Sequence, residues 1–296
     1  MAGTSGAPHG GSPGSGAPTE PGESAPVGSL AGRVALITGA GSGLGRATAI
    51  TMASRGARIV ACDLSAAGLE ATLALLPGSG HLPVTGDIAR QNEVDAVVAA
   101  ALADAGTSGI DILVNSAGIA EGAGDTFEHS LEHWQKIIDV NLTGSYLMCQ
   151  AVARAMRDSG RGGVILNLSS IAGVIGLPRR TAYSASKGAV SMMTRVLAAE
   201  WARYGIRVNA VAPGYIRTPL TEKLAAEGRL DVAAILRRSP TGAMGTAQDV
   251  ADALAFLASD QATFITGAIL PVDGAYTAYG APEDAYPAEL LGAPDA

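Results

Sequence analysis

The sequence has few aromatic residues, few charged residues and no long apolar run. Phe, Trp and Tyr make up 4% of its 296 residues, and charged residues make up 16%. No segment approaches the ~20 consecutive apolar residues that a membrane-spanning helix needs. No basic N-terminus leads into an apolar segment, as a secretory signal would require. Hydrophobic residues still make up 48%, so we expect a globular protein with a substantial core and no membrane partner.

Cysteine is also scarce, because the chain has only Cys62 and Cys149. They fall in an apparent strand end and an apparent helix, and neither has a metal-ligating residue at usable spacing. We therefore predict two buried free thiols. A chain with this cysteine usage fits a reducing, cytoplasmic setting.

Positive charge does not accumulate anywhere in the chain. The net charge is −7, but six of the 27 acidic residues lie near the two ends, while all 20 Lys and Arg lie between residues 29 and 274. The middle of the chain is therefore close to neutral. This balance gives no indication of a nucleic-acid partner or of binding to an anionic membrane surface.

The two ends differ in composition from the rest of the chain. Residues 1–28 contain eight Gly and five Pro, a composition that cannot bury a core, so we predict a disordered N-terminal tail. Residues 275–296 are rich in Ala, Pro, Tyr and acidic residues without a clear period, and we predict a second tail. Its three tyrosines suggest that it docks on the protein. Residues 29–274 then form one domain.

Within that domain, short apolar runs alternate with helical stretches. This alternation predicts a doubly wound α/β domain with about seven parallel strands and helices on both faces of the sheet. The long stretch from Leu131 to Met156 is predicted as one helix. A long irregular segment from Tyr215 to Gly245 is interpreted as a lid. Strands are expected near residues 34–37, 58–62, 81–85, 110–114, 164–168, 206–211 and 268–272.

A glycine-rich turn follows the first predicted strand. The segment Thr38-Gly39-Ala40-Gly41-Ser42-Gly43-Leu44-Gly45 leads directly into a helical stretch. Strand, glycine-rich turn and helix together place backbone N–H groups and a helix N-terminus against a phosphate, and the missing Cβ atoms allow a pyrophosphate to approach. The strict G-x-G-x-x-G spacing is absent, and T-G-x-x-x-G-x-G stands in its place. A plain tight turn is the alternative interpretation.

Asp63 ends the second predicted strand, twenty residues after Gly43. A carboxylate there can accept hydrogen bonds from the adenosine ribose hydroxyls and would repel a 2′-phosphate. We therefore favour NAD over NADP. Arg46 is the nearby base that could instead accommodate the phosphorylated cofactor, and a solvated turn Asp is the alternative without a ligand.

Tyr183 and Lys187 are four residues apart in a run of helix formers, so they share one helix face. With seven tyrosines and three lysines in the chain, a chance Tyr-x-x-x-Lys match is expected only about 0.07 times. A Lys ammonium near a phenol favours the phenolate and lowers the phenol pKa. We therefore expect Lys187 to make Tyr183 an acid/base near neutral pH.

Two further features lie in the predicted 131–156 helix and just before it. His129 and His133 have a spacing that can hold a metal ion, but no third ligand is apparent and acidic neighbours suggest a solvated helix start, so no metal site is predicted. Asn141 and Gly144 disfavour a helix interior, which predicts either a kink or a function there.

Taken together, these residues resemble the single-domain short-chain dehydrogenase/reductase family. The likeness spans residues 30–274. It rests on the glycine-rich turn, Asp63, Asp87, Asn141, Ser170, Tyr183 with Lys187, Asn-Ser-Ala-Gly at residues 115–118, and Pro-Gly-x-x-x-Thr at residues 213–218. Two departures are small: Ser116 stands where the family more often has Asn, and Ser169 competes with Ser170. Ser170 lies thirteen residues before Tyr183, the family's usual separation, and is preferred.

The resemblance implies a Rossmann-type fold and an oxidoreductase mechanism. Tyr183 would be the general acid/base toward a ketone or secondary alcohol, and Ser170 would hydrogen-bond the substrate oxygen. Lys187 would hold the nicotinamide ribose, and Asn141 would anchor a water in a proton relay. The implied cofactor contacts are Thr38, Gly39, Gly41, Ser42, Gly43, Leu44, Gly45, Asp63, Leu64, Asp87, Ile88, Asn115, Ala117, Gly118, Tyr183, Lys187, Pro213, Gly214, Ile216 and Thr218.

The substrate is less well defined. The expected pocket residues Ser170, Ile171, Leu177, Tyr183 and Tyr215 are mostly apolar, which suggests a nonpolar ketone or alcohol. Arg179 and Arg180 could meet an anionic substrate, but an interface or solvent-facing role is favoured. The alternatives to an NAD-dependent enzyme are an NADPH-dependent ketoreductase of 3-oxoacyl type and a non-catalytic nucleotide-binding protein. The family resemblance also implies a homotetramer.

Overall fold

The computed structural model describes residues 27–104, 109–122 and 124–280. Most of the predicted N-terminal tail and residues 281–296 of the predicted C-terminal tail therefore lie outside the described residues. In the part of the chain that is described, no helix has both the length and the hydropathy of a membrane span.

One parallel sheet of seven strands forms the centre of the domain, in the order β3-β2-β1-β4-β5-β6-β9. This confirms the predicted doubly wound α/β sheet. Each predicted strand is present within two residues of its expected start and end. The strands are β1 (Val34–Thr38), β2 (Arg58–Asp63), β3 (Leu82–Thr85), β4 (Ile112–Asn115), β5 (Gly163–Leu168), β6 (Ile206–Pro213) and β9 (Ile269–Val272).

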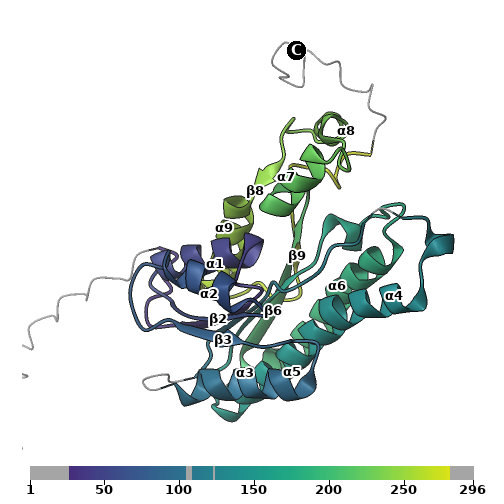
Figure 1. Ribbon diagram of the computed structural model, residues 1–296. Helices are drawn as coiled ribbons and strands as arrows, with labels where there is room; N and C mark the ends of the chain where they lie inside the picture. Colours follow the sequence, from purple (N-terminus) through teal and green to yellow (C-terminus); the bar gives the residue numbers. More distant parts are fainter. Residues whose placement is uncertain (1–26, 105–108, 123, 281–296) are drawn as a thin grey trace, which may run out of the picture.

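Helices cover both faces of the sheet (Figure 1). On one face lie α1 (Gly43–Ser54), α2 (Ala66–Leu73) and α9 (Ala247–Ala258), and on the other lie α3 (Gln91–Ala103), α5 (Ser145–Asp158) and α6 (Thr181–Trp201). Each face has its own apolar core, with Met52 and Leu254 in one and Val98 and Met148 in the other. Because the inner strands β1, β2, β4, β5 and β6 are buried on both sides, they read as continuous apolar runs in the sequence, whereas the edge strands β3 and β9 are partly exposed.

The predicted helix over residues 131–156 is interrupted. It consists of α4 (Leu131–Ile138), a π-helical turn at Asp139–Gly144 and α5. The turn contains both residues that disfavour a helix interior, Asn141 and Gly144. A Cβ at Gly144 would lie 2.8 Å from the Ile88 side chain, so the close approach of that side chain requires glycine. The predicted irregularity is therefore confirmed as a change of helical pitch.

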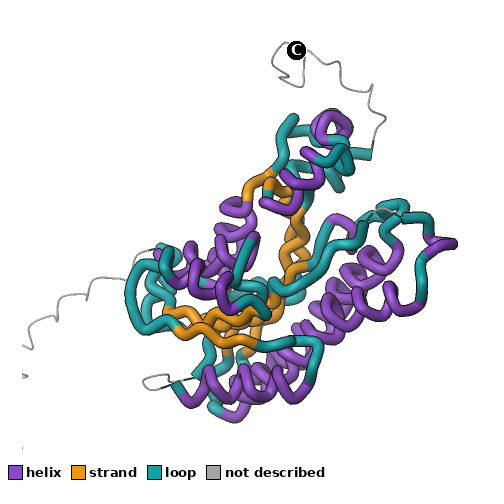
Figure 2. Tube along the Cα trace, viewed as in Figure 1, coloured by secondary structure: helices purple, strands orange, loops and turns teal. Residues whose placement is uncertain are grey.

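The prediction of a structureless lid was wrong in its local structure. The segment contains β7 (Ile216–Arg217), α7 (Pro219–Ala226), α8 (Val232–Arg238) and β8 (Gly245–Thr246), and β7 pairs with β8 (Figure 2). Local signals explain both helices. Thr218 caps α7 through a capping box with Pro219 in the first turn, and the Asp231 carboxylate caps α8.

The described start of the C-terminal segment docks beside α8, as its tyrosines suggested. The Tyr276 ring lies 5.4 Å from the Tyr215 ring, and the Arg238 guanidinium lies 4.9 Å from the ring centroids of both Tyr276 and Tyr279. Such contacts hold an amphipathic segment on a surface. They also place Tyr276 next to a residue of the cavity described below.

Both cysteines are buried free thiols, as predicted. Burial raises the pKa of Cys62 and of Cys149 to about 12. Neither thiol is therefore a nucleophile at neutral pH.

Candidate functional site

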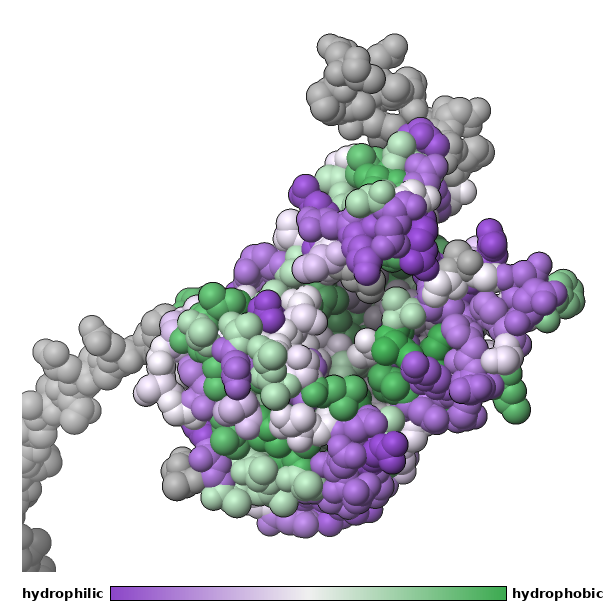
Figure 3. Space-filling view, in the orientation of Figure 1, coloured by the Kyte–Doolittle hydropathy of each residue, from purple (hydrophilic) through white to green (hydrophobic). Residues whose placement is uncertain are grey.

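A cavity of about 1280 Å³ opens at the carboxyl ends of the strands. The loops after β1, β2, β3, β4, β5 and β6 all contribute to its lining, and α4 and the start of α7 complete it. Figure 3 shows the surface hollowed between the part that carries α7 and the part that carries α4. Ligands of open α/β sheets bind at this edge, so this cavity is the candidate active site.

At one end of the cavity, the glycine-rich turn packs tightly against the sheet. A Cβ at Gly39 would lie 2.8 Å from the Ala117 backbone, and a Cβ at Gly45 would lie 2.1 Å from the Gly39 carbonyl. Helix α1 begins here with Ser42 at its N-cap, yet Ser42 makes no side-chain capping bond and the first turn holds no acidic residue. The N–H groups of this helix end are thus left for another acceptor, which fits a cofactor pyrophosphate.

The carboxylate of Asp63 closes the same end. One of its oxygens accepts the Gly41 N–H at 2.9 Å and the other accepts the Ser65 N–H at 2.9 Å. A Cβ at Gly41 would lie 2.8 Å from the carboxyl carbon, so glycine lets the acid approach the turn. Arg46 does not line the cavity. Its guanidinium donates to the Thr72 hydroxyl and to the carbonyls of Gly41 and Gly68.

Behind the lining, polar side chains hold the strand ends together. The Thr38 hydroxyl accepts the N–H groups of Ser116 and Ala117, both at 3.1 Å. The Asn115 amide donates to the Asn167 side chain at 2.9 Å. Thr38 and Asn115 are buried and do not line the cavity. These two predicted cofactor contacts therefore lie behind the cavity wall, where they hold the strand ends together.

At the other end of the cavity lie Ser170, Tyr183 and Lys187. Ser170 follows β5, where its Oγ accepts the Ala172 N–H, while Tyr183 and Lys187 stand on the first two turns of α6. The Lys187 ammonium lies 5.8 Å from the Tyr183 ring centroid and donates to the Leu168 carbonyl at 2.8 Å. Ser169 is turned away from Tyr183, because its hydroxyl contacts the Lys187 carbonyl and the Ser191 hydroxyl.

The electrostatics of this group differ from the prediction for Lys187. Burial raises the pKa of Tyr183 above its ordinary value, while a hydrogen bond with Ser170 and the positive charge of Arg180 act in the opposite direction. Burial also lowers the pKa of Lys187 to about 8. The groups that lower the pKa of Tyr183 are thus Ser170 and Arg180, and the expected lowering by Lys187 is not found.

Asn141 is fully buried and does not line the cavity. Its side-chain oxygen accepts the Ile119 N–H at 2.8 Å, and its amide donates to the Ile119 carbonyl at 3.0 Å and to the Ser186 hydroxyl at 3.3 Å. The amide thereby ties the loop after β4 to the π-helical turn and to α6. A water anchored by Asn141 remains a prediction.

Most of the other predicted residues line the cavity. In the substrate region, Tyr215 lines it, whereas Ile171 and Leu177 do not. Gly41 packs behind Asp63 and is not part of the lining either. The predicted cofactor contacts found on the wall are Gly39, Ser42, Gly43, Leu44, Gly45, Asp63, Leu64, Asp87, Ile88, Ala117, Gly118, Tyr183, Lys187, Pro213, Gly214, Ile216 and Thr218.

The two arginines before Tyr183 have different positions. Arg179 is exposed and has a positive φ of 65°. Arg180 is half-buried and donates to the Glu121 carbonyl. Neither lines the cavity, but Arg180 is close enough to act on the pKa of Tyr183.

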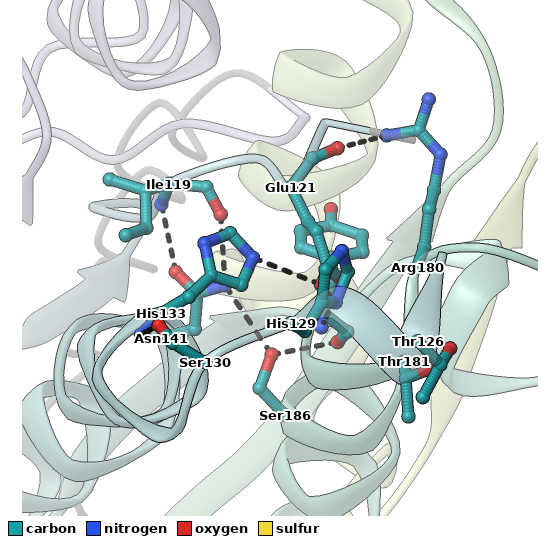
Figure 4. Close-up of polar contacts among 11 residues, drawn as sticks. Ile119, Glu121, Thr126, His129, Ser130, His133, Asn141, Arg180, Thr181 and Ser186 are labelled. Atoms are coloured by element: carbon teal, nitrogen blue, oxygen red, sulfur yellow. Dashed lines mark hydrogen bonds and ion pairs between the residues drawn. The ribbon is translucent and has the colours of Figure 1, made fainter. Parts of the chain in front are cut away.

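Sequence reasoning missed two groups of residues. The first is a wall of the cavity formed by Glu132, Gln135 and Lys136 of α4 and by Asp139 of the π-helical turn; no motif marks it. The second is Glu121, whose buried carboxylate lies beside His129 and His133 (Figure 4). The spacing of His129 and His133 is visible in the sequence, but Glu121 comes from a different loop, so the prediction that the two histidines lack a third potential ligand is wrong.

Comparisons with known proteins agree with this geometry. The family model described as enoyl-(acyl carrier protein) reductase matches residues 39–277. The cis-4-hydroxycyclohexanecarboxylate dehydrogenase of Sinomonas cyclohexanicum is 43% identical over 251 residues, which cover 84% of this chain and 98% of that protein. An uncharacterized short-chain type dehydrogenase/reductase of Sinorhizobium fredii is 41% identical over 258 residues, 87% of this chain; the chain spans only 46% of that longer relative.

A solved structure gives the same result for the fold. A proposed 2-deoxy-D-gluconate 3-dehydrogenase from Agrobacterium tumefaciens, with bound NADP, superposes with a TM-score of 0.77 at 39% sequence identity. The match covers 85% of this chain and 99% of that one. The chain belongs to the short-chain dehydrogenase/reductase family, whose members are oxidoreductases that use a nicotinamide cofactor.

Proposed function

We propose that the protein is an NAD-dependent oxidoreductase that interconverts a secondary alcohol and its ketone, with Tyr183 as the general acid/base. The observation that carries this proposal is the shared cavity. It joins the uncapped N-terminus of α1 and the Asp63 carboxylate at one end to Ser170, Tyr183 and Lys187 at the other. Membership of an oxidoreductase family argues against the non-catalytic alternative.

The proton in this reaction moves at the Tyr183 oxygen. During reduction, the Tyr183 hydroxyl donates its proton to the ketone oxygen; during oxidation, the phenolate accepts the proton of the alcohol. The Ser170 hydroxyl donates a hydrogen bond to the same substrate oxygen and stabilises charge that develops there. The nicotinamide, when bound, supplies or accepts the hydride. Because burial raises the pKa of Tyr183 above its ordinary value, the phenol is protonated at neutral pH.

Lys187 and Asn141 would position the groups that take part in this proton transfer. The Lys187 ammonium, anchored on the Leu168 carbonyl, would hold the nicotinamide ribose and keep positive charge near the phenol. The Asn141 side chain fixes the Ile119 segment, beside which a relay water would be held. Both roles follow the family resemblance.

The Asp63 carboxylate supports NAD as the cofactor. It would accept hydrogen bonds from the adenosine ribose hydroxyls, and a 2′-phosphate at that place would meet its negative charge. Arg46 is occupied by Thr72 and backbone carbonyls. Arg90, which lines the cavity, already pairs with Asp87 and Glu93. The solved relative with bound NADP makes NADP the competing cofactor.

The substrate class is proposed from the lining near Tyr183. Tyr215, Ile216 and Pro219 contribute apolar groups to the lining, while Gln135 and Lys136 of α4 contribute polar groups. This mixture fits a small ketone or alcohol with one polar substituent. A 3-oxoacyl reductase is the alternative assignment, supported by a 3-oxoacyl-[acyl-carrier-protein] reductase of Thermotoga maritima that is 40% identical over 248 residues.

A homotetramer is proposed as the assembly. Large apolar side chains lie exposed on α5 and α6, with Tyr146, Met192 and Val196 exposed by 42%, 57% and 47%. Exposed apolar patches on neighbouring helices indicate an interaction surface. The cytoplasmic location stays a prediction.

Steady-state kinetics with NAD and with NADP test the proposal. Purified protein is assayed with a panel of cyclic and acyclic secondary alcohols and with a 3-oxoacyl thioester. We expect kcat/KM for a secondary alcohol to be at least about tenfold higher with NAD than with NADP, the effect of one like-charge contact. A strong preference for NADPH together with the 3-oxoacyl thioester would contradict the proposal and support its alternative.

A further inference from the structure

Three side chains that could ligate a metal ion converge beside the N-terminus of α6. Glu121 comes from the loop after β4, His129 from the residue after a short 3-10 turn (Thr126–Glu128), and His133 from the first turn of α4. Oε1 of Glu121 lies 3.2 Å from His129 Nδ1 and 3.2 Å from His133 Nε2. Figure 4 shows both imidazoles directed toward this carboxylate.

The carboxylate of Glu121 is deeply buried without a strong cation. Its side chain is 0% exposed, and a buried carboxylate is costly unless it is paired or coordinates a metal. Within the described residues, its ion pairs are with the two histidines alone. Arg180 donates to the backbone carbonyl of Glu121 and not to the carboxylate. A divalent cation at Oε1 would supply the missing positive charge.

The distances are those of long hydrogen bonds, and they also match the spacing of donor atoms around a metal ion. Charge-assisted N–H···O⁻ bonds are usually about 2.7–2.9 Å long, whereas both contacts here are 3.2 Å. Tetrahedral zinc with bonds of about 2.0–2.1 Å places neighbouring donor atoms about 3.3 Å apart. The three donor atoms all lie within 4.8 Å of one another, and the His133 side chain, 40% exposed, has room to adjust to an ion.

The surroundings also match those of a metal site. The other oxygen of Glu121, Oε2, accepts the Tyr183 N–H at 2.9 Å, and such a second bond orients a ligating carboxylate. A Cβ at Gly124 would lie 2.2 Å from His129 Nε2, so glycine there leaves room for the His129 ring. His133 is partly exposed, which gives an ion access and leaves a position for water.

We propose that Glu121, His129 and His133 bind one divalent transition-metal ion of the zinc class, with water as the fourth ligand. Two imidazoles and one carboxylate are a ligand set that zinc accepts. The ion would join α4 and the loop after β4 to the backbone of Tyr183, at the start of the helix that carries the proposed acid/base. This site is separate from the nicotinamide cavity and does not depend on the proposed function.

Metal titration of the untagged full-length protein tests this site. After treatment with a chelator and dialysis, the protein is titrated with Zn²⁺ by calorimetry and with Co²⁺ by visible absorption. We expect one equivalent of Zn²⁺ per chain, the intense visible bands of tetrahedral Co²⁺, and a higher melting temperature with Zn²⁺.

His133→Gln and His129→Gln are the test variants, and His81→Gln is the matched control. His81 accepts the Ile59 N–H far from the cluster, and glutamine can replace that acceptor. We expect the control to keep stoichiometric binding and both test variants to lose it, with unchanged far-UV circular dichroism. If His129→Gln fails to fold, His133→Gln still tests the site, because the partly exposed His133 can be replaced with little effect on packing. Absence of stoichiometric Zn²⁺ binding in the wild type, or its persistence in His133→Gln, would overturn the proposal.

Discussion

The two ends of the cavity are built in different ways. At the proposed cofactor end, backbone groups of the glycine-rich turn and one half-exposed carboxylate, Asp63, face the cavity. At the proposed catalytic end, Ser170 and Lys187 are buried side chains, and they depend on β5 and α6 for their positions. A site made of backbone N–H groups is formed by the local conformation of one turn. A site made of buried polar side chains also removes ionisable groups from water, and this desolvation shifts their pKa values.

The largest effect on stability is expected at the buried lysine. The pKa of Lys187 is about 8 in the folded protein against an ordinary 10.5. Above pH 8 the folded state has lost a proton that the unfolded state keeps, so stability rises with pH until the unfolded lysine also titrates. From about pH 7 to about pH 10, the unfolding free energy of the wild type should rise by about 2–3 kcal/mol relative to Lys187→Met.

Urea denaturation of both proteins across this pH range measures that difference. Lys223→Met serves as a control, because Lys223 lies on the surface and its side chain is 73% exposed. Parallel pH dependences in the wild type and Lys187→Met would show that the lysine is solvated, and the contrast between the two ends of the cavity would then disappear.

Replacing the two neighbouring serines separates catalysis from packing. Ser170→Ala removes the proposed donor to the substrate oxygen, and we expect kcat/KM to fall by about 10²-fold. The same change removes a contact that lowers the pKa of Tyr183. For ketone reduction, which uses the protonated phenol, the alkaline limb of the pH–rate profile should therefore move to higher pH.

Ser169→Ala is the matched variant, and its expected effect is on stability. It loses the contacts with the Lys187 carbonyl and the Ser191 hydroxyl, which are worth about 1–3 kcal/mol when a buried partner is left unpaired. If Ser169→Ala lost the greater part of the activity while Ser170→Ala kept it, the choice of Ser170 would be wrong.

A smaller effect is expected at the cofactor end. Asp63→Asn removes the negative charge but keeps an oxygen that can accept the Gly41 N–H. We expect the preference for NAD over NADP, measured as the ratio of kcat/KM values, to fall about tenfold. Retention of the full wild-type preference would mean that Asp63 does not face the adenosine ribose.

The two ends of the cavity also differ in how much of their structure the sequence predicts. The sheet, the glycine-rich turn and Asp63 follow from local patterns, because each strand and the loop after it are contiguous in the chain. The convergence of Ser170 with Tyr183 could be expected from the family resemblance, but the influence of Arg180 on Tyr183 could not. Glu121 was missed because its partners His129 and His133 meet it only after α4 folds against α6.

The segment after β6 illustrates the same point at the level of helices. Its two short helices carry local capping signals at Thr218 and Asp231, so they could have been found by reading caps instead of periodicity. The packing of Tyr276 on Tyr215, in contrast, is a long-range contact. No local sequence pattern predicts which surface a tyrosine from a distant segment will contact.

The measurement that tests the central claim most directly is the turnover of Tyr183→Phe, made together with its affinity for NADH. Removing the phenol oxygen deletes the proposed proton donor and acceptor while the aromatic ring remains. We predict that kcat for alcohol oxidation falls by about 10²–10⁴-fold, while NADH still binds within about threefold of the wild-type affinity by fluorescence titration. Wild-type turnover in this variant would show that Tyr183 is not the acid/base and would contradict the account.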